Sequence, residues 1–257
     1  MRILRTVLVI FICCMPMATL AVQQYTVRVT DQKPQSREIF VQGLEIVDGY
    51  LYVSSGRYGH SHLLRYHFAQ STLDTARKLD AKIFAEGLTV FEDKVYQLTW
   101  HNRGALVYHK QGLQFDHVFS LPGEGWGLTN NAKELIYSDG SDQLHFLSPQ
   151  TKQILHSIQV TENGKPLPRL NELEWVDGKI WANVWQTDRI VIIEPTSGEV
   201  TASIDLQGLL PANERRAGTD VLNGIARNPA DGSIWVTGKR WPWLYQIALD
   251  PVTPVSK

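Results

Sequence analysis

A short unit recurs five times along the chain, and this repetition restricts the possible folds more than any other feature of the sequence. In each copy a Gly-Leu pair or its equivalent opens an alternating segment, a polar turn follows, and a segment containing Tyr or Trp comes next. The copies begin 40 to 52 residues apart, at Gly43, Gly87, Gly127, Glu172 and Gly224. This period is typical of a four-stranded blade, so we expect an all-β fold, a five-bladed β-propeller.

The polar turns support this interpretation, because Asn, Asp and Gly favour the positive φ angles of tight β-hairpins. They are Asp48-Gly49, Glu92-Asp93, Asn130-Asn131, Asp177-Gly178 and Asp231-Gly232. The first four copies have room for four strands each, whereas the fifth ends too early for a fourth strand. Residues 24–30 form a spare alternating segment near the N-terminus. We expect this segment to complete the last blade and close the ring, which leaves no exposed sheet edge.

Residues 1–21 are typical of a secretory signal peptide. Arg2 and Arg5 precede an apolar run over residues 7–14, and small residues follow it up to Ala21. The run is too short for a membrane-spanning helix, which takes about 20 residues. We therefore expect an exported chain, periplasmic or secreted, in which residues 22–257 form a single domain with no membrane attachment after cleavage.

Cysteine content and charge exclude several classes of function. The two cysteines, Cys13 and Cys14, both lie in the signal segment, so the exported chain has no thiol for a disulfide, a zinc site or a nucleophile. The 25 Lys and Arg residues are balanced by 26 Asp and Glu residues, and no long basic run is present. We expect no nucleic-acid partner, because phosphate binding requires clustered basic side chains. We also expect a monomer.

Propeller geometry predicts where a site would form, because the first strand of every blade lines the central channel. The residues that immediately precede the five units are Gln42, Glu86, Trp126, Asn171 and Asn223. Glu86 is the candidate for acid–base chemistry, since a carboxylate among aromatic side chains is desolvated and its pKa rises. The carboxamides could equally serve only to hydrogen-bond neighbouring blades, and for Asn223 both interpretations are open.

The ends of the second strands add Trp100, Trp185 and Lys239 to the same region. Trp100, Trp126 and Trp185 have polar or glycine neighbours, and we assign them to a small-ligand pocket, in which aromatic walls surround a few polar groups. Another four tryptophans are expected to pack within and between blades: Trp175, Trp181, Trp235 and Trp241.

Nine short strings, in order along the chain, resemble the glutamine cyclotransferases of the plant and bacterial type. They cover Phe40 to Trp243 and include Phe84-Ala85-Glu86-Gly87-Leu88-Thr89, Gly123-Glu124-Gly125-Trp126-Gly127-Leu128-Thr129 and Asn171-Glu172-Leu173-Glu174-Trp175. The chain departs from the family pattern at Val41, where Thr is usual, and at Val53, where Glu is expected. The resemblance implies an enzyme that converts an N-terminal glutamine of peptides or proteins into pyroglutamate and releases ammonia.

The resemblance also implies roles for individual residues. Glu86 is expected to be the catalytic acid and base. Substrate binding is expected from Phe40, Gln42, Trp100, Trp126, Asn171, Trp185 and Lys239. We expect no cofactor and no metal.

Two local patterns could bind metal ions, and we consider both weak. His60 and His62 would share one face of a strand at their i, i+2 spacing, as zinc ligands can. Asp139 and Asp142 could bind calcium.

Two other functions compete with the cyclotransferase hypothesis. A propeller can bind peptides or sugars in an aromatic pocket without catalysing a reaction. A glycoside hydrolase would need a second acid opposite Glu86, and none stands at the five equivalent positions. A Glu86→Gln change distinguishes the hypothesis of a binding module from that of an enzyme, because only the enzyme needs a carboxylate that exchanges a proton.

Overall fold

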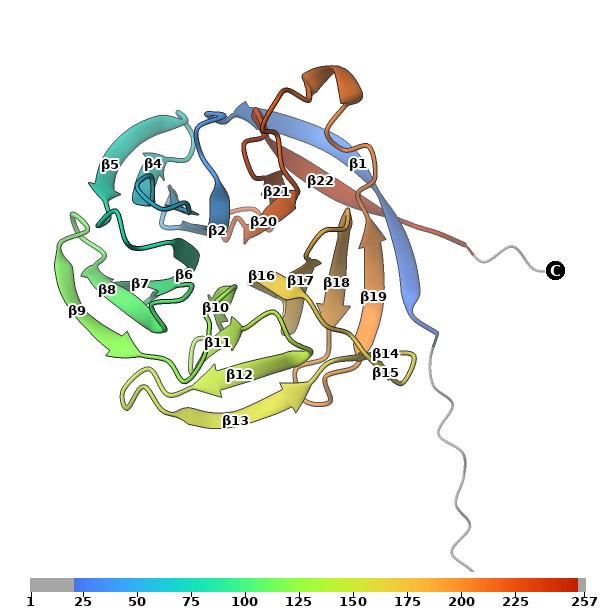
Figure 1. Ribbon diagram of the computed structural model, residues 1–257. Coiled ribbons are helices and arrows are strands. Elements are labelled where there is room, and N and C mark those ends of the chain that lie inside the picture. The colour runs from blue at the N-terminus through green and yellow to red at the C-terminus, as the bar shows by residue number, and fades with distance from the viewer. Residues whose placement is uncertain (1–20, 254–257) are drawn as a thin grey trace, which may run out of the picture.

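The computed structural model describes residues 21–253, and these are almost entirely β-strand, as expected. The predicted signal peptide, apart from Ala21, lies outside the described residues. Among residues 21–253 no helix is long and apolar enough to cross a membrane. Figure 1 shows the strands arranged in sheets around a central axis.

Three sheets contain four antiparallel strands each, connected in sequence order. The first contains β2 (Val41–Val47), β3 (Tyr50–Ser55), β4 (His62–His67) and β5 (Thr72–Lys78). The second contains β6 (Ala85–Phe91), β7 (Lys94–Thr99), β8 (Gly104–His109) and β9 (Phe115–Ser120). The third contains β10 (Leu128–Asn130), β11 (Leu135–Ser138), β12 (Gln143–Leu147) and β13 (Ile154–Gln159).

A fourth sheet has eight strands and joins the two ends of the described chain. Its order is β16 (Leu170–Val176), β17 (Lys179–Val184), β18 (Arg189–Ile193), β19 (Val200–Asp205), β1 (Gln23–Pro34), β22 (Trp243–Pro251), β21 (Ile234–Gly238) and β20 (Leu222–Arg227). Strand β1 pairs in parallel with β19 and antiparallel with β22. The spare strand predicted at residues 24–30 is therefore present and is longer than expected.

Two small elements were not expected from the sequence. A two-stranded hairpin of β14 (Thr161–Glu162) and β15 (Lys165–Pro166) follows the third sheet. A single 3-10 turn, η1 (Ala212–Glu214), precedes β20. Both lie between the recurring units, in segments that the repeat pattern does not describe.

The first strands of successive units contact one another in a closed cycle, in the order β2, β6, β10, β16, β20 and back to β2. Glycine makes this close approach possible. A Cβ atom at Gly87 would lie 2.5 Å from the backbone nitrogen of Leu128 on the next first strand. Gly43 and Gly127 approach their neighbours in the same way, which explains why glycine recurs at the start of the unit.

Glu172 stands where the other four units have glycine, and its side chain binds backbone N–H groups instead. Its Oε1 accepts a hydrogen bond from Leu44 N at 3.0 Å, and its Oε2 accepts one from Ile225 N at 2.9 Å. Burial raises the pKa of Glu172 well above its ordinary value, although the two backbone donors lower it. Glu172, on β16, thus links the first strands β2 and β20 through these two hydrogen bonds.

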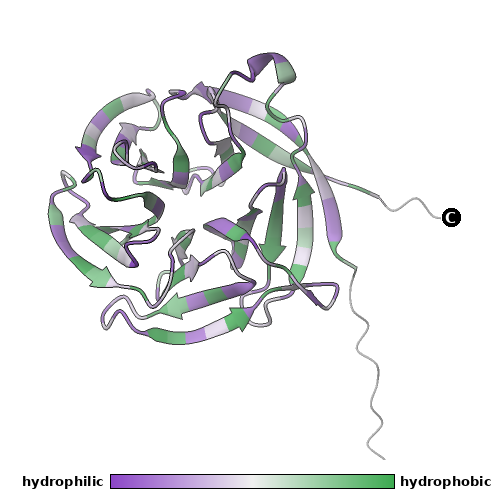
Figure 2. Cartoon of the chain, in the orientation of Figure 1, coloured by the Kyte–Doolittle hydropathy of each residue, from purple (hydrophilic) through white to green (hydrophobic). Residues whose placement is uncertain are grey.

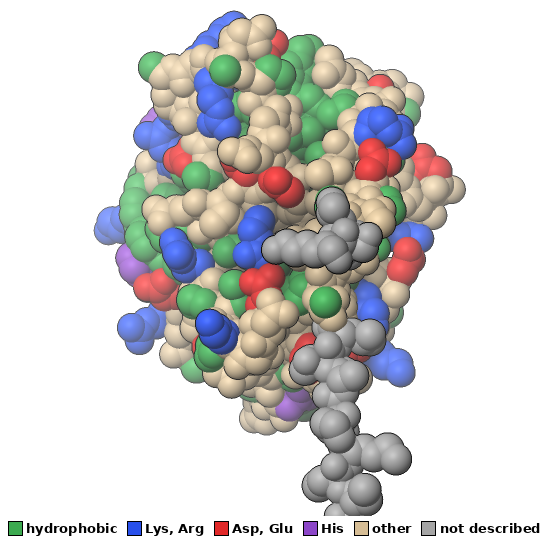
Figure 3. Space-filling model, turned by 90° about the vertical axis from the view of Figure 1, so that its right-hand side faces the viewer, with side chains coloured by type: hydrophobic (Ala, Val, Ile, Leu, Met, Phe, Trp, Pro, Cys, Tyr) green, Lys and Arg blue, Asp and Glu red, His purple; other side chains and the backbone are tan. Residues whose placement is uncertain are grey.

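Apolar side chains fill the space between neighbouring sheets, and Figure 2 shows hydrophobic and hydrophilic residues alternating along the strands. Trp181, Trp235 and Trp241 are buried in this core, as predicted, and Trp175 is partly buried. On the face shown in Figure 3, basic and acidic side chains are interspersed.

Candidate functional site

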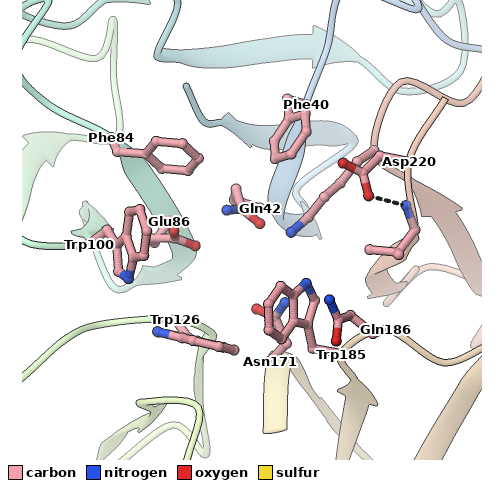
Figure 4. A pocket seen from close by; sticks show the side chains of 12 residues that line it. Phe40, Gln42, Phe84, Glu86, Trp100, Trp126, Asn171, Trp185, Gln186 and Asp220 are labelled. Atoms are coloured by element: carbon pink, nitrogen blue, oxygen red, sulfur yellow. Dashed lines mark hydrogen bonds between the residues drawn. The ribbon is translucent and has the colours of Figure 1, made fainter. Parts of the chain in front are cut away.

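A cavity of about 320 Å³ opens where the first strands begin and the second strands end. All eight residues assigned to the site from the sequence line this cavity (Figure 4). They are Phe40, Gln42, Glu86, Trp100, Trp126, Asn171, Trp185 and Lys239. The structure thus brings them together, while their roles in a reaction stay predictions.

Irregularities in the first strands direct polar side chains to this region. The pairing register shifts between Val41 and Gly43, between Ala85 and Leu88, and between Leu170 and Leu173. Gln42, Glu86 and Asn171 lie within these shifts. A bulge turns a side chain out of the regular alternation, which is why such features are common beside active sites.

Asn223 occupies the equivalent position in the last unit but does not line the cavity. Its Nδ2 donates to the carbonyl of Val41 at 3.0 Å and to Gln42 Oε1 at 3.4 Å. Of the two interpretations open for Asn223, the structure favours hydrogen bonding to a neighbouring strand. This contact also orients the Gln42 carboxamide.

Glu86 is the buried carboxylate of the site, with 5% of its surface exposed. Burial raises its pKa well above the ordinary value, Lys239 lowers it, Glu124 raises it, and hydrogen bonding from Gln42 lowers it. Glu86 therefore keeps its proton to higher pH than an exposed carboxyl group does. This is the property that general acid–base catalysis requires.

Lys239 follows the end of β21 and is 4% exposed. Burial lowers its pKa, while the carboxylates of Glu86 and Asp220 raise it. Its Nζ lies 5.1 Å from the centre of the Phe40 ring, an arrangement that favours the charged ammonium. Lys239 can thus supply positive charge to the cavity.

Aromatic rings form the walls. Trp126 and Trp185 meet edge to face with their centres 5.3 Å apart. Phe84 makes edge contacts with Phe40 at 6.3 Å and with Trp100 at 5.6 Å. Such a wall encloses an apolar chain and excludes water from the polar groups between the rings.

Asn171 brings an unused acceptor to the cavity. The residue is 2% exposed, and its Oδ1 has no hydrogen-bond partner within the described part of the chain. A buried carbonyl of this kind is costly unless a ligand or water binds it. Asn171 is therefore suited to accept a hydrogen bond from an N–H group of a substrate.

Four cavity residues were missing from the sequence assignment: Phe84, Gln186, Asp220 and Val221. Phe84 could have been found, because it precedes Glu86 by two positions, as Phe40 precedes Gln42. Val221 has the same relation to Asn223.

The two weak metal patterns have other roles in the structure. His60 lies in a turn before β4, and its backbone carbonyl is hydrogen-bonded to the Nδ1 of His62 at 2.8 Å. The expectation that both rings share a strand face is therefore wrong. Asp139 binds His145 at 3.1 Å and Ser141, whereas Asp142 binds Gln159 at 2.7 Å. Within residues 21–253 no three His, Cys, Asp or Glu side chains are grouped so that they could hold a metal ion.

Comparison with known proteins identifies the family. The family model described as "Glutamine cyclotransferase" matches residues 4–249. The chain belongs to the glutamine cyclotransferase family. It is similar to a glutaminyl-peptide cyclotransferase of Arabidopsis thaliana, with 35% identity over 239 residues that cover 90% of this chain and 73% of the relative.

Solved structures agree with this family assignment. The crystal structure of Myxococcus xanthus glutaminyl cyclase superposes with a TM-score of 0.84 and 31% identity, over 90% of this chain and all of that one. The WD40 β-propeller domain of Doa1 is similar in fold alone, with a TM-score of 0.50 and 11% identity over 81% of this chain and 63% of that one. The fold of this cyclotransferase family member is thus propeller-like.

Proposed function

We propose that this chain is a glutaminyl-peptide cyclotransferase that converts an N-terminal glutamine of peptides or proteins into pyroglutamate. The observation that carries the proposal is the buried Glu86, with its raised pKa, in an aromatic cavity that also contains Lys239. Family membership supports the same reaction.

The reaction forms one bond and breaks another. The α-amino nitrogen of the substrate attacks its own side-chain amide carbon, which gives a five-membered ring and a tetrahedral oxyanion. The bond from this carbon to the amide nitrogen then breaks, and ammonia leaves. The attacking amine must lose a proton and the leaving nitrogen must gain one.

Glu86 transfers this proton in the proposed mechanism. Its carboxylate accepts the proton from the amine, whose ordinary pKa is about 7.7 to 8.0, and then donates it to the leaving nitrogen. A carboxyl group with a raised pKa suits both steps, because neither proton transfer is then strongly unfavourable.

The other residues bind and orient the substrate. We assign the stabilisation of the oxyanion to Lys239 and Gln42, and the binding of a substrate N–H group to Asn171. Phe40, Trp100, Trp126 and Trp185 enclose the glutamine side chain, which holds the amine against the amide carbon. No step requires a metal ion or an organic cofactor, and we propose a metal-independent reaction.

We further propose that the fold is a five-bladed propeller in which β1 completes the last blade. The cycle of first strands and the position of β1 beside β22 in the eight-stranded sheet support this count. Hydrogen exchange tests the closure: the hydrogen-bonded amides of β1 between Thr26 and Lys33, the stretch that pairs with β22, should exchange as slowly as those of β22. Rapid exchange of these amides would contradict it.

Export of the chain is also a proposal, which follows from the signal-like residues 1–21. Mass spectrometry of the protein recovered from periplasm or medium tests it. A mature N-terminus near residue 22 would support export, and a chain that keeps residues 1–21 in the cytoplasm would refute it.

Ammonia release from a short peptide with an N-terminal glutamine tests the main proposal, with and without a strong chelator. We expect activity with the chelator, and a loss of 10²-fold or more in kcat for Glu86→Gln, the range for removal of a general acid–base group. Circular dichroism should show an unchanged fold. Unchanged turnover in Glu86→Gln, or an inactive wild type that only binds the peptide, would refute the proposal.

A further inference from the structure

Glu124 connects two walls of the cavity, although it was not among the predicted site residues. Its Oε2 accepts a hydrogen bond from Trp100 Nε1 at 2.8 Å and another from Trp126 Nε1 at 3.0 Å. Trp100 follows β7 of one sheet, and Trp126 precedes β10 of the next. One carboxylate oxygen therefore holds two indoles that come from neighbouring sheets.

The second oxygen of Glu124 has a partner of its own. Its Oε1 lies 3.2 Å from His101 Nδ1, and the His101 ring stacks on Trp100 with the ring centres 3.7 Å apart. Both oxygens are thus engaged, and the orientation of the carboxylate is defined. We call the two hydrogen bonds from Trp100 and Trp126 to Glu124 the clamp. Hydrogen bonds to a charged acceptor are stronger than those between neutral groups, so the strength of the clamp depends on the negative charge of Glu124.

The repeat explains why this side chain lies next to the walls of the cavity. Glu124 precedes Trp126 by two positions, as Phe40 precedes Gln42, Phe84 precedes Glu86, and Val221 precedes Asn223. Those three residues line the cavity. Phe40, Phe84 and Val221 are apolar, whereas Glu124 is acidic. Packing at this border of the cavity therefore does not explain Glu124.

Glu124 also acts on Glu86 through its charge. Burial does most to raise the pKa of Glu86, and the negative charge of Glu124 raises it further, against the effect of Lys239. The pKa of Glu124 itself is lowered: burial raises it, but the two tryptophan donors and His101 outweigh that effect. Glu124 is therefore negatively charged at neutral pH.

We propose that Glu124 is a positioning residue that orients Trp100 and Trp126 around the substrate and adds negative charge beside the reacting centre. The proposal rests on the cyclotransferase function proposed above. It gives one side chain two separable effects, one on the geometry of the walls and one on the charge at the reacting centre.

Two substitutions separate these effects. Glu124→Gln keeps an oxygen that accepts from the indoles but removes the charge, so it should lower the pKa of Glu86. We expect the acid limb of the kcat/KM profile to move to lower pH by about half a unit or more, with a small change in KM. Glu124→Ala also removes the clamp, and we expect KM to rise by about tenfold, the equivalent of one or two hydrogen bonds.

The indole N–H resonances report the clamp independently of activity. The chain has eight tryptophans, and Trp100→Phe and Trp126→Phe identify two of the indole signals. In Glu124→Ala we expect these two signals to shift toward exposed values, while the signals of the five tryptophans other than Trp185, which contacts Trp126, stay in place. An inactive wild type would refute the cyclotransferase function, but these signals would still show whether Glu124 orders the walls.

Glu134→Gln is the matched control. Glu134 also accepts a side-chain hydrogen bond, from Asn131 at 2.9 Å, and lies 3.4 Å from a histidine, His156, but it does not line the cavity. We expect this variant to keep the wild-type pH profile and indole signals. Unmoved Trp100 and Trp126 signals in Glu124→Ala, or an unmoved acid limb in Glu124→Gln, would overturn the proposal.

Discussion

Gly140 lies against the indole of Trp126, so that a Cβ atom at residue 140 would come within 2.6 Å of the ring. The glycine has a φ of +83°, a conformation that other residues rarely adopt. Trp126 thus packs against both Gly140 and the ring of Trp185. The wall of the cavity depends on the absence of a side chain at residue 140.

Gly140→Ala should therefore displace Trp126 and weaken substrate binding. We expect KM to rise several-fold, a shift in tryptophan fluorescence, and a loss of about 1 to 2 kcal/mol in the free energy of unfolding from the positive φ. Gly49→Ala is the control, since Gly49 has a similar φ of +77° but would bring its Cβ within 4 Å of no atom. Equal KM values for the two variants would contradict the contact with Trp126.

Lys239→Met should move the activity profile in the direction opposite to Glu124→Gln. The ammonium lowers the pKa of Glu86, so its removal raises this pKa further. Because the base form of Glu86 starts the reaction, the acid limb of kcat/KM should shift to higher pH. Lys179→Met, which removes an ion pair to Glu194 away from the cavity, should leave the profile unchanged. An acid limb that stays in place or moves to lower pH in Lys239→Met would refute this electrostatic link.

The architecture could be predicted because its signals are local. A hairpin turn marks each unit, and the glycines at Gly43, Gly87 and Gly127 each allow a close contact between first strands. The β14–β15 hairpin and η1 could not be predicted in this way. They lie in stretches between units, where the repeat has no equivalent positions to compare.

The site could be predicted where equivalent positions of the repeat converge, which is how Glu86, Trp126 and Asn171 were found. Asp220 and Gln186 were missed because they lie in connecting segments between strands, outside the repeat positions that were compared. The burial of carboxylates was harder still to foresee. Glu45 and Glu174 are acidic residues in strands, and only the packing of neighbouring strands reveals that both are desolvated.

Glu45 provides a test of stability that does not involve the reaction. It lies on β2 beyond Gln42, and its Oε2 accepts a hydrogen bond from Val90 N at 2.6 Å. Burial raises its pKa from 4.5 to about 7, while the bonds from Val90 and Thr89 and the charge of Lys110 lower it. The folded chain therefore holds a proton on Glu45 that the unfolded chain loses near pH 4.5.

The free energy of unfolding should therefore fall as the pH rises from about 4.5 to about 7, because the folded state binds more protons in this range. Glu45→Gln removes this dependence and should stabilise the protein at pH 8 by about 1 to 3 kcal/mol, since one pKa unit corresponds to about 1.4 kcal/mol. Some slope will remain, because Glu172 and Glu174 also have raised pKa values. Urea unfolding at pH 5, 6, 7 and 8 measures the effect, with the exposed Glu199→Gln as the control. A Glu45→Gln variant that is less stable than the wild type at pH 8 would mean that the charged carboxylate stabilises the fold, contrary to its burial.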